Sequence, residues 1–230
     1  MRNFRIILFT LLSVCSLTVR GASDLNSVLE RGRDLFGYGR WSDARHEFLR
    51  ARALLDPADR AAREEIDYYL AACAVELGSD DAEGALRDFE RRHPGSVYAN
   101  DVRFSLGSYY CAVGNMPLAR EAFERTEYKA LSAPRREQYD IRMGYVEFTQ
   151  GDYAAAYDRF SRIGSRSEYA DHALYYRSYI DYAEGRYDRA KEGFTQLTRS
   201  DAYRDLVPFY LLQIEFRNGN YRYVVDHGEE

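Results

Sequence analysis

The chain has 230 residues, of which 46% are hydrophobic and 30% charged, as in most folded proteins. Its net charge of −5 argues against a general nucleic-acid binder. The cysteines Cys15, Cys73 and Cys111 are too few and too scattered to form a disulfide framework or a zinc site.

Residues 1–21 have the layout of a secretory signal peptide. Two arginines precede an apolar stretch at residues 6–17, which is shorter than the roughly 20 residues of a transmembrane helix. Val19 and Gly21 favour cleavage after Gly21, so we expect an exported protein. A lipid anchor at Cys15 is disfavoured because Val14 is larger than the residue usual before a lipidated cysteine. An uncleaved anchor is the remaining alternative.

A short pattern recurs along the rest of the chain: Gly, a usually aromatic residue two positions later, Ala five later and Phe nine later. The best copy is Gly151, Tyr153, Ala156 and Phe160. The alanine-equivalent positions 44, 85, 119, 156, 190 and 224 lie 41, 34, 37, 34 and 34 residues apart. A period near 34 residues is typical of helix–turn–helix repeats. The other copies start at Gly39, Gly114 and Gly185, with weaker ones at Asp80 (continuing to Ala82, Ala85 and Phe89) and at Gly219.

The pattern predicts two antiparallel helices per unit, with the glycine in the turn between them, where a left-handed backbone costs little. We expect the first helices at 25–38, 61–77, 98–113, 136–150, 168–184 and 203–218. Seven residues before each glycine position the side chain is mostly small, which indicates a close approach of the two helices: Gly32, Cys73, Gly107, Gly144, Ser178 and, as an exception, Leu212. Four residues later a bulky or apolar side chain follows: Phe36, Leu77, Cys111, Phe148, Tyr182 and Phe216.

These features resemble the tetratricopeptide repeat, over residues 24–227. The resemblance implies an all-α fold, a right-handed α-solenoid of about six helix–turn–helix repeats whose last repeat is incomplete. The repeat array would cover 22–230, with repeats at roughly 25–57, 61–95, 98–131, 136–166, 168–201 and 203–230. The second unit departs from the pattern, because Asp80 replaces the glycine. The sequence therefore leaves the conformation of its turn undecided.

One segment of the chain points to a particular group of tetratricopeptide repeat proteins. Residues 89–99 are similar to the repeat variant of bacterial envelope proteins, including outer-membrane assembly lipoproteins and cell-division coordinators. The whole chain resembles the N-terminal portion of large secreted multi-repeat proteins of Bacteroidetes-type bacteria. We therefore expect localisation in the periplasm or at the outer-membrane periphery.

The sixth unit has a short second helix, so Phe209, Leu212 and Phe216 have little to cover them. Repeat arrays usually end in a helix with a polar outer face. We therefore expect the C-terminal end to continue into further repeats or to be capped by a partner.

Catalytic constellations are missing from the sequence. The four histidines lie far apart, and no phosphate-binding loop, nucleophile elbow or C-x-x-C motif occurs. We expect no enzymatic activity, no cofactor and no metal, and we interpret the many acidic residues as solvated helix faces. Cys73 and Cys111 are interpreted as buried apolar side chains, with a disulfide between them as the alternative.

In tetratricopeptide repeats the first helices line the concave face, which the resemblance implies as a peptide-binding groove. Tyr145 and Tyr179 stand out there because they occupy matching positions on consecutive repeats, and tyrosine offers a rigid apolar ring with a polar tip. Lysine and asparagine, which form the family's carboxylate clamp, are absent from the corresponding positions. The candidate binding residues are Tyr145, Tyr179, Phe148, Tyr182, Ser108, Gln213 and Tyr175.

The leading hypothesis is an exported, non-enzymatic scaffold that binds a protein or peptide in the bacterial cell envelope. One alternative is a structural spacer within a larger multi-repeat protein. Another is a carbohydrate-binding or glycan-handling module, because aromatic rings also stack on sugars.

Overall fold

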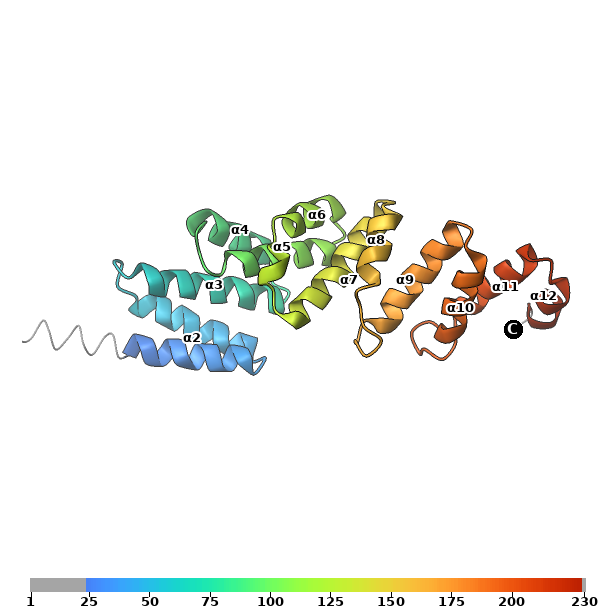
Figure 1. The fold of residues 1–230 in the computed structure, drawn as a ribbon. Helices are drawn as coiled ribbons and strands as arrows, with labels where there is room; N and C mark the ends of the chain where they lie inside the picture. The colour runs from blue at the N-terminus through green and yellow to red at the C-terminus, as the bar shows by residue number, and fades with distance from the viewer. Residues whose placement is uncertain (1–23, 229–230) are drawn as a thin grey trace, which may run out of the picture. The chain divides into compact units, whose positions relative to one another are not determined.

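The computed structural model describes residues 24–228, and all regular structure in this part of the chain is helical (Figure 1). The predicted all-α class is therefore confirmed. A first helix occupies residues 24–37. It is followed by α2 (Trp41–Leu54), α3 (Arg60–Glu76), α4 (Ala82–Arg92), α5 (Ala99–Ala112), α6 (Met116–Glu124), a 3-10 turn (Tyr128–Ala130), α7 (Ala133–Thr149), α8 (Tyr153–Phe160), α9 (Ala170–Ala183), α10 (Tyr187–Leu197), α11 (Val207–Arg217) and α12 (Tyr221–His227). The predicted signal peptide lies outside the described residues.

The chain divides into two compact units, one ending at Tyr109 and the other beginning at Tyr110, with the boundary inside α5. In the first unit the core lies among helix 24–37, α2 and α3, and Phe48 and Ile66 are fully buried in it. In the second unit one core lies among α7, α8 and α9, and the next among α9, α10 and α11. Each core thus joins a helix pair to the first helix of the following pair.

A glycine with a positive φ closes the turn between the helices of each described pair. In the first pair the N–H of Gly39 donates to the carbonyl of Phe36 at 3.0 Å, and the N–H of Arg40 donates to that of Leu35 at 2.9 Å. The φ angles lie between 61° and 79°, where glycine avoids the steric cost of a Cβ. The predicted turn glycines are confirmed at Gly39, Gly114, Gly151, Gly185 and Gly219.

The alanine and phenylalanine of the pattern are completely buried in four helix pairs. An added Cβ at Gly144 would lie 2.8 Å from the ring of Phe160, and one at Gly32 would lie 2.8 Å from the ring of Phe48. The small column is therefore small because a phenylalanine ring of the second helix occupies the space next to it. The buried pairs are Ala44 with Phe48, Ala119 with Phe123, Ala156 with Phe160, and Ala190 with Phe194.

The second helix pair has the same kind of turn and buried residues as the others, but at positions that differ from those predicted from the sequence. Gly78, not Asp80, has the positive φ, at 61°. Ala82 and Leu86 are fully buried, four residues apart like Ala44 and Phe48, whereas Ala85 is only half-buried. The expected positions of the turn at Asp80 and of the buried alanine at Ala85 were therefore wrong, although Phe89, the predicted phenylalanine, is buried. The cause is that Leu86 takes the place of the usual phenylalanine, which hides the match.

Two first helices begin at positions that their prolines explain. α7 begins at Ala133, three residues before the expected start, with Pro134 in its first turn. α11 begins at Val207, four residues after the expected start, and Pro208 lies in its first turn. Proline is favoured there because the first amide groups of a helix have no intrahelical partner.

Replacing Gly144 by Ala tests the close approach to Phe160. We expect the free energy of unfolding to fall by about 1–3 kcal/mol, because overpacking outweighs the better helix propensity of alanine. Urea unfolding followed by circular dichroism measures it. Gly84→Ala is the matched control, since Gly84 also lies inside a helix but has open space around it. An equal response of both variants would contradict the packing argument.

Candidate functional site

The predicted groove residues lie on four first helices and are all half-buried. Ser108 lies on α5 in the first unit, where its hydroxyl donates to the carbonyl of Phe104 at 2.9 Å. The other six lie in the second unit: Tyr145 and Phe148 on α7, Tyr175, Tyr179 and Tyr182 on α9, and Gln213 on α11.

Five of these six residues contact one another directly, in two groups: Phe148, Tyr179 and Tyr175 form one, and Tyr182 and Gln213 form the other. The rings of Tyr179 and Phe148 meet in a T-shaped arrangement, with 5.3 Å between centroids. The hydroxyl of Tyr182 donates to Oε1 of Gln213. The ring of Tyr175 lies 6.4 Å from that of Tyr179. These side chains therefore contribute to packing between repeats as well as to the surface.

Tyr145 differs from the other five residues because it makes few contacts with its neighbours. The one ring contact it makes within the described chain is to Tyr176, at 5.7 Å between centroids in a tilted arrangement. Its hydroxyl has no hydrogen-bond partner among the described residues. Tyr145 is thus the predicted groove residue with the most freedom to meet a ligand.

Three tyrosines that the sequence pattern did not single out stand nine residues before a turn glycine and connect consecutive repeats. Each of these rings stacks on the buried phenylalanine of the preceding second helix and contacts the bulky residue of the preceding first helix. We call each such set an aromatic junction. The three junctions are Tyr69 with Phe48 (4.6 Å, 3° between planes) and Phe36 (5.3 Å); Tyr176 with Phe160 (5.1 Å, 15°) and Phe148 (4.9 Å); and Tyr210 with Phe194 (4.8 Å, 10°) and Tyr182 (5.6 Å).

Tyr210 extends its junction further, because its ring also meets Tyr179 edge-on at 5.8 Å. Its hydroxyl lies 3.4 Å from that of Tyr175, within hydrogen-bond distance. Burial, followed by this hydrogen bond, raises the pKa of Tyr175. The sequence does contain this regularity, because each of these tyrosines lies nine residues before Gly78, Gly185 or Gly219. It can be recognised at Gly78 only once the second repeat is aligned on this glycine instead of on Asp80.

A second column that was missed consists of buried acids four residues before the turn glycine. Glu147, Asp181 and Glu215 are only 3–4% exposed, although acidic residues were expected on solvated faces. Each has a basic partner: Arg159 Nε lies 2.7 Å from Glu147, Arg186 Nε lies 2.5 Å from Asp181, and Lys191 pairs with Glu215. These carboxylates therefore fix neighbouring helices to one another.

The two ends of this acid column differ in protonation behaviour. Burial raises the pKa of Glu147, and this outweighs the opposing effect of Arg159. The pKa of Glu215 is lowered, mainly by Lys191 and then by the amide of Asn220, which donates to the carboxylate at 2.8 Å. The ion pair of Glu215 joins α10 to α11 and so connects two repeats.

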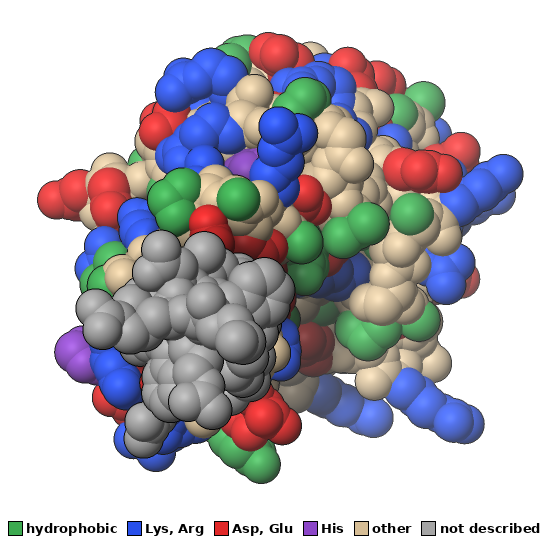
Figure 2. Space-filling view, turned by 90° about the vertical axis from the view of Figure 1, so that its left-hand side faces the viewer, with side chains coloured by type: hydrophobic (Ala, Val, Ile, Leu, Met, Phe, Trp, Pro, Cys, Tyr) green, Lys and Arg blue, Asp and Glu red, His purple; other side chains and the backbone are tan. Residues whose placement is uncertain are grey.

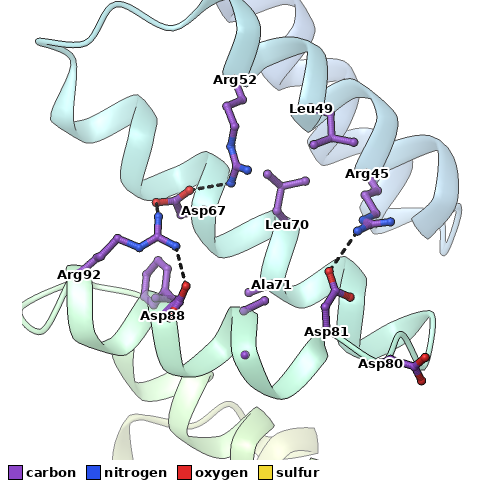
Figure 3. Close-up of a pocket in the computed structure, with 13 residues that line it drawn as sticks. Arg45, Leu49, Arg52, Asp67, Leu70, Ala71, Asp80, Asp81, Asp88 and Arg92 are labelled. Atoms are coloured by element: carbon purple, nitrogen blue, oxygen red, sulfur yellow. Dashed lines mark hydrogen bonds and ion pairs between the residues drawn. The ribbon is translucent and has the colours of Figure 1, made fainter.

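A charged hollow of about 460 Å³ lies among α2, α3 and α4 in the first unit (Figure 3). Arg52 and Arg92 both point to the buried Asp67, at 2.8 and 3.0 Å, and Arg45 reaches Asp81 at 3.3 Å. Because each arginine in the hollow already has a carboxylate partner, the arrangement is a set of ion pairs that link helices. It leaves no unpaired arginine in the hollow for a ligand.

Cys73 and Cys111 are free thiols. Burial raises the pKa of each to about 11, so both remain protonated at neutral pH. Their interpretation as buried apolar side chains fits Cys73, which is fully buried, better than Cys111, which is half-buried.

Residues 24–228 contain no cluster of three or more His, Cys, Asp or Glu side chains that could hold a metal ion. None of the helices described is both long and apolar enough to cross a bilayer. In the face that Figure 2 views, basic and acidic side chains are interspersed, without a surface of one sign.

Two solved structures are similar to the chain in fold. A tetratricopeptide repeat protein from Parabacteroides merdae superposes with a TM-score of 0.59 and 16% identity, over 88% of this chain and 77% of that one. Cut9, in a complex described as the APC/C hetero-tetramer Cut9–Hcn1, gives 0.53 and 17% over 84% of this chain and 37% of the other. No protein-family model and no curated protein matches the sequence. The fold is therefore that of tetratricopeptide repeat solenoids.

Truncating Tyr176 tests the aromatic junction. We expect Tyr176→Ala to lower the free energy of unfolding by about 2–4 kcal/mol, because a large, half-buried ring that packs on Phe160 is lost. Tyr176→Phe should change it by less than about 1 kcal/mol, since the ring that stacks on Phe160 is kept. Denaturant unfolding of both variants measures this, and a Phe variant as unstable as the Ala variant would show that the hydroxyl, not the ring, is responsible.

Replacing Glu215 by Gln tests the acid column through its pH dependence. Because the folded-state pKa is lowered, the stability that Glu215 contributes is present above the ordinary carboxyl pKa and is lost as the pH falls through the folded-state value. We expect Glu215→Gln to cost about 1–2 kcal/mol at neutral pH. The difference from the native chain should shrink at acid pH. Glu192→Gln, at an exposed position on α10, is the control; a difference independent of pH would contradict the assignment.

Proposed function

We propose that the protein is an exported, non-enzymatic scaffold that binds a protein or peptide segment along α7 and α9 in the bacterial cell envelope. The proposal that this surface binds a ligand rests on Tyr145. This side chain is half-buried on a first helix, and within the described chain it makes a single ring contact and has a free hydroxyl. A rigid ring with an unsatisfied polar tip is well suited to peptide recognition. The fold supports the proposal, because stacked helix pairs give extended binding surfaces.

Export and envelope location rest on residues 1–21 and on the resemblance of residues 89–99. The periplasm or the periphery of the outer membrane is the compartment that we propose. The partner would be a protein or peptide segment rather than nucleic acid, in line with the negative net charge.

A structural spacer is the second candidate, and one observation favours it. Phe148, Tyr179 and Tyr182 pack against Tyr176 or Tyr210 of the aromatic junctions, so much of the aromatic surface already serves the array itself. In this case the repeats would only set the distance between other parts of a larger assembly.

Affinity capture from a solubilised envelope extract separates the two candidates. We expect Tyr145→Ala to keep the helicity of the native chain but to reduce recovery of one or two specific proteins about tenfold, as expected for a central contact residue. Tyr38→Ala is the matched control, because this tyrosine is 80% exposed and lies on the first unit. Identical proteins on all three baits would refute the groove and favour the spacer.

A further inference from the structure

A second hollow, of about 420 Å³, adjoins the charged hollow of the first unit. The two share Arg52, Asp67 and Arg92 in their walls. The end of α2, the loop after it, the first half of α3 and the end of α4 meet around the second one. We call it the arginine hollow, and it is lined by Arg52, Leu55, Pro57, Arg63, Ile66, Asp67 and Arg92.

The two hollows differ in the balance of their charges. The charged hollow is lined by four aspartates and three arginines. The arginine hollow also has three arginines, but the carboxylate of Asp67 is the one acidic group in its lining. Its wall therefore carries a formal charge of +2, in a chain whose net charge is −5. Positive charge gathered around a concave site raises the local concentration of anions.

Asp67 positions two of the three arginines but cannot neutralise both. Its Oδ1 accepts from Arg52 at 2.8 Å, and its Oδ2 accepts from Arg92 at 3.0 Å and lies 3.0 Å from Nε2 of His93. Figure 3 shows Arg52 and Arg92 reaching Asp67 from α2 and α4. Arg92 also lies 3.4 Å from Asp88, which belongs to the wall of the charged hollow and not to that of the arginine hollow. The buried Asp67 thus fixes two guanidinium groups at the edge of the arginine hollow.

Arg63 supplies the third positive charge, and it has no carboxylate partner among the described residues. Its Nη2 donates to the carbonyl of Pro57 at 2.8 Å, which ties the side chain to the loop between α2 and α3. A guanidinium group has five N–H donors, so this one bond leaves the others for a ligand. The planar guanidinium can donate two parallel hydrogen bonds to one phosphate group.

The rest of the lining is apolar and limits the kind of anion. Leu55, Pro57 and Ile66 can contact the carbon skeleton of a small phosphate ester. A group with two negative charges matches the charge of the wall better than a single carboxylate does. The negative net charge of the chain disfavours a polynucleotide at this place.

We infer that the arginine hollow binds a phosphate group, as the dianion of a phosphomonoester, through Arg63 together with Arg52 and Arg92. The phosphate balances the positive charge that Asp67 leaves, and the organic part of the ester lies against Leu55 and Ile66. This site lies in the first unit, whereas the binding surface around Tyr145 lies in the second. The two proposals therefore do not depend on each other.

Titration of the full chain with inorganic phosphate at neutral pH, followed by calorimetry, tests the site. We expect saturable binding with a Kd of about 1 mM or below. Arg63→Ala should weaken it about fivefold or more, because a charge-assisted contact is lost. Arg199→Ala is the matched control, since it removes the same charge at an exposed position of the second unit. Both variants should keep the circular dichroism of the native chain.

Three results would overturn the inference. Phosphate could fail to saturate the native chain, or Arg63→Ala and Arg199→Ala could weaken it equally, which would show diffuse attraction to surface charge. Acetate could bind as tightly as phosphate, which would replace the phosphate by a carboxylate. Tyr145→Ala should leave phosphate binding unchanged, so failure of the groove proposal is recognised separately.

Flotation with phosphatidylcholine vesicles, with and without phosphatidic acid, identifies the source of the phosphate group. Flotation that requires both phosphatidic acid and Arg63 assigns a lipid headgroup to the hollow. Phosphate binding without flotation assigns a soluble phosphate ester instead.

Discussion

The stacking of a tyrosine on the phenylalanine of the preceding repeat is the interaction that joins consecutive repeats at three places in the array. Phe48, Phe160 and Phe194 are fully buried, and each is covered on one side by such a tyrosine. Aromatic pairs contribute about 0.5–1.5 kcal/mol beyond the area they bury. Since each repeat of a solenoid contacts only its neighbours, stability is set interface by interface, and these junctions supply the largest buried side chains at those interfaces.

Space for each stacking ring is created by small residues on the first helix and by the left-handed turn glycine. Gly144 gives room to Phe160, and Gly151 brings α8 back along α7 at the required distance. The buried acids make hydrogen-bonded contacts that depend on direction. The carboxylate of Glu215, for example, accepts hydrogen bonds from Lys191 on α10 and from Asn220 in the turn that follows α11. Apolar stacking therefore supplies the stabilisation, and the ion pairs restrict the relative orientation of the helices.

Packing and binding share the same helix surfaces in this fold. Tyr179 contacts both Phe148 and Tyr210, so a ligand that used it would act on a side chain that also joins repeats. Tyr145 has less of this double role, because its one ring contact within the described chain is to Tyr176. The same reasoning applies at α12, where Phe216 repeats the surroundings of Phe148 but has no following helix over it in the described chain.

The sequence by itself determined the helical class, the period and the turn glycines, because a fixed spacing of Gly, Ala and Phe leaves few local conformations open. It also indicated that Phe209, Leu212 and Phe216 have little to cover them; in the described chain Phe209 and Phe216 are exposed, whereas Leu212 is half-buried. It could not assign the register of the second repeat, where Leu86 replaces phenylalanine. The tyrosine junctions and the buried acids were decided only by the tertiary structure, because whether Tyr210 or Glu215 is a surface or a core residue depends on which helix packs against it.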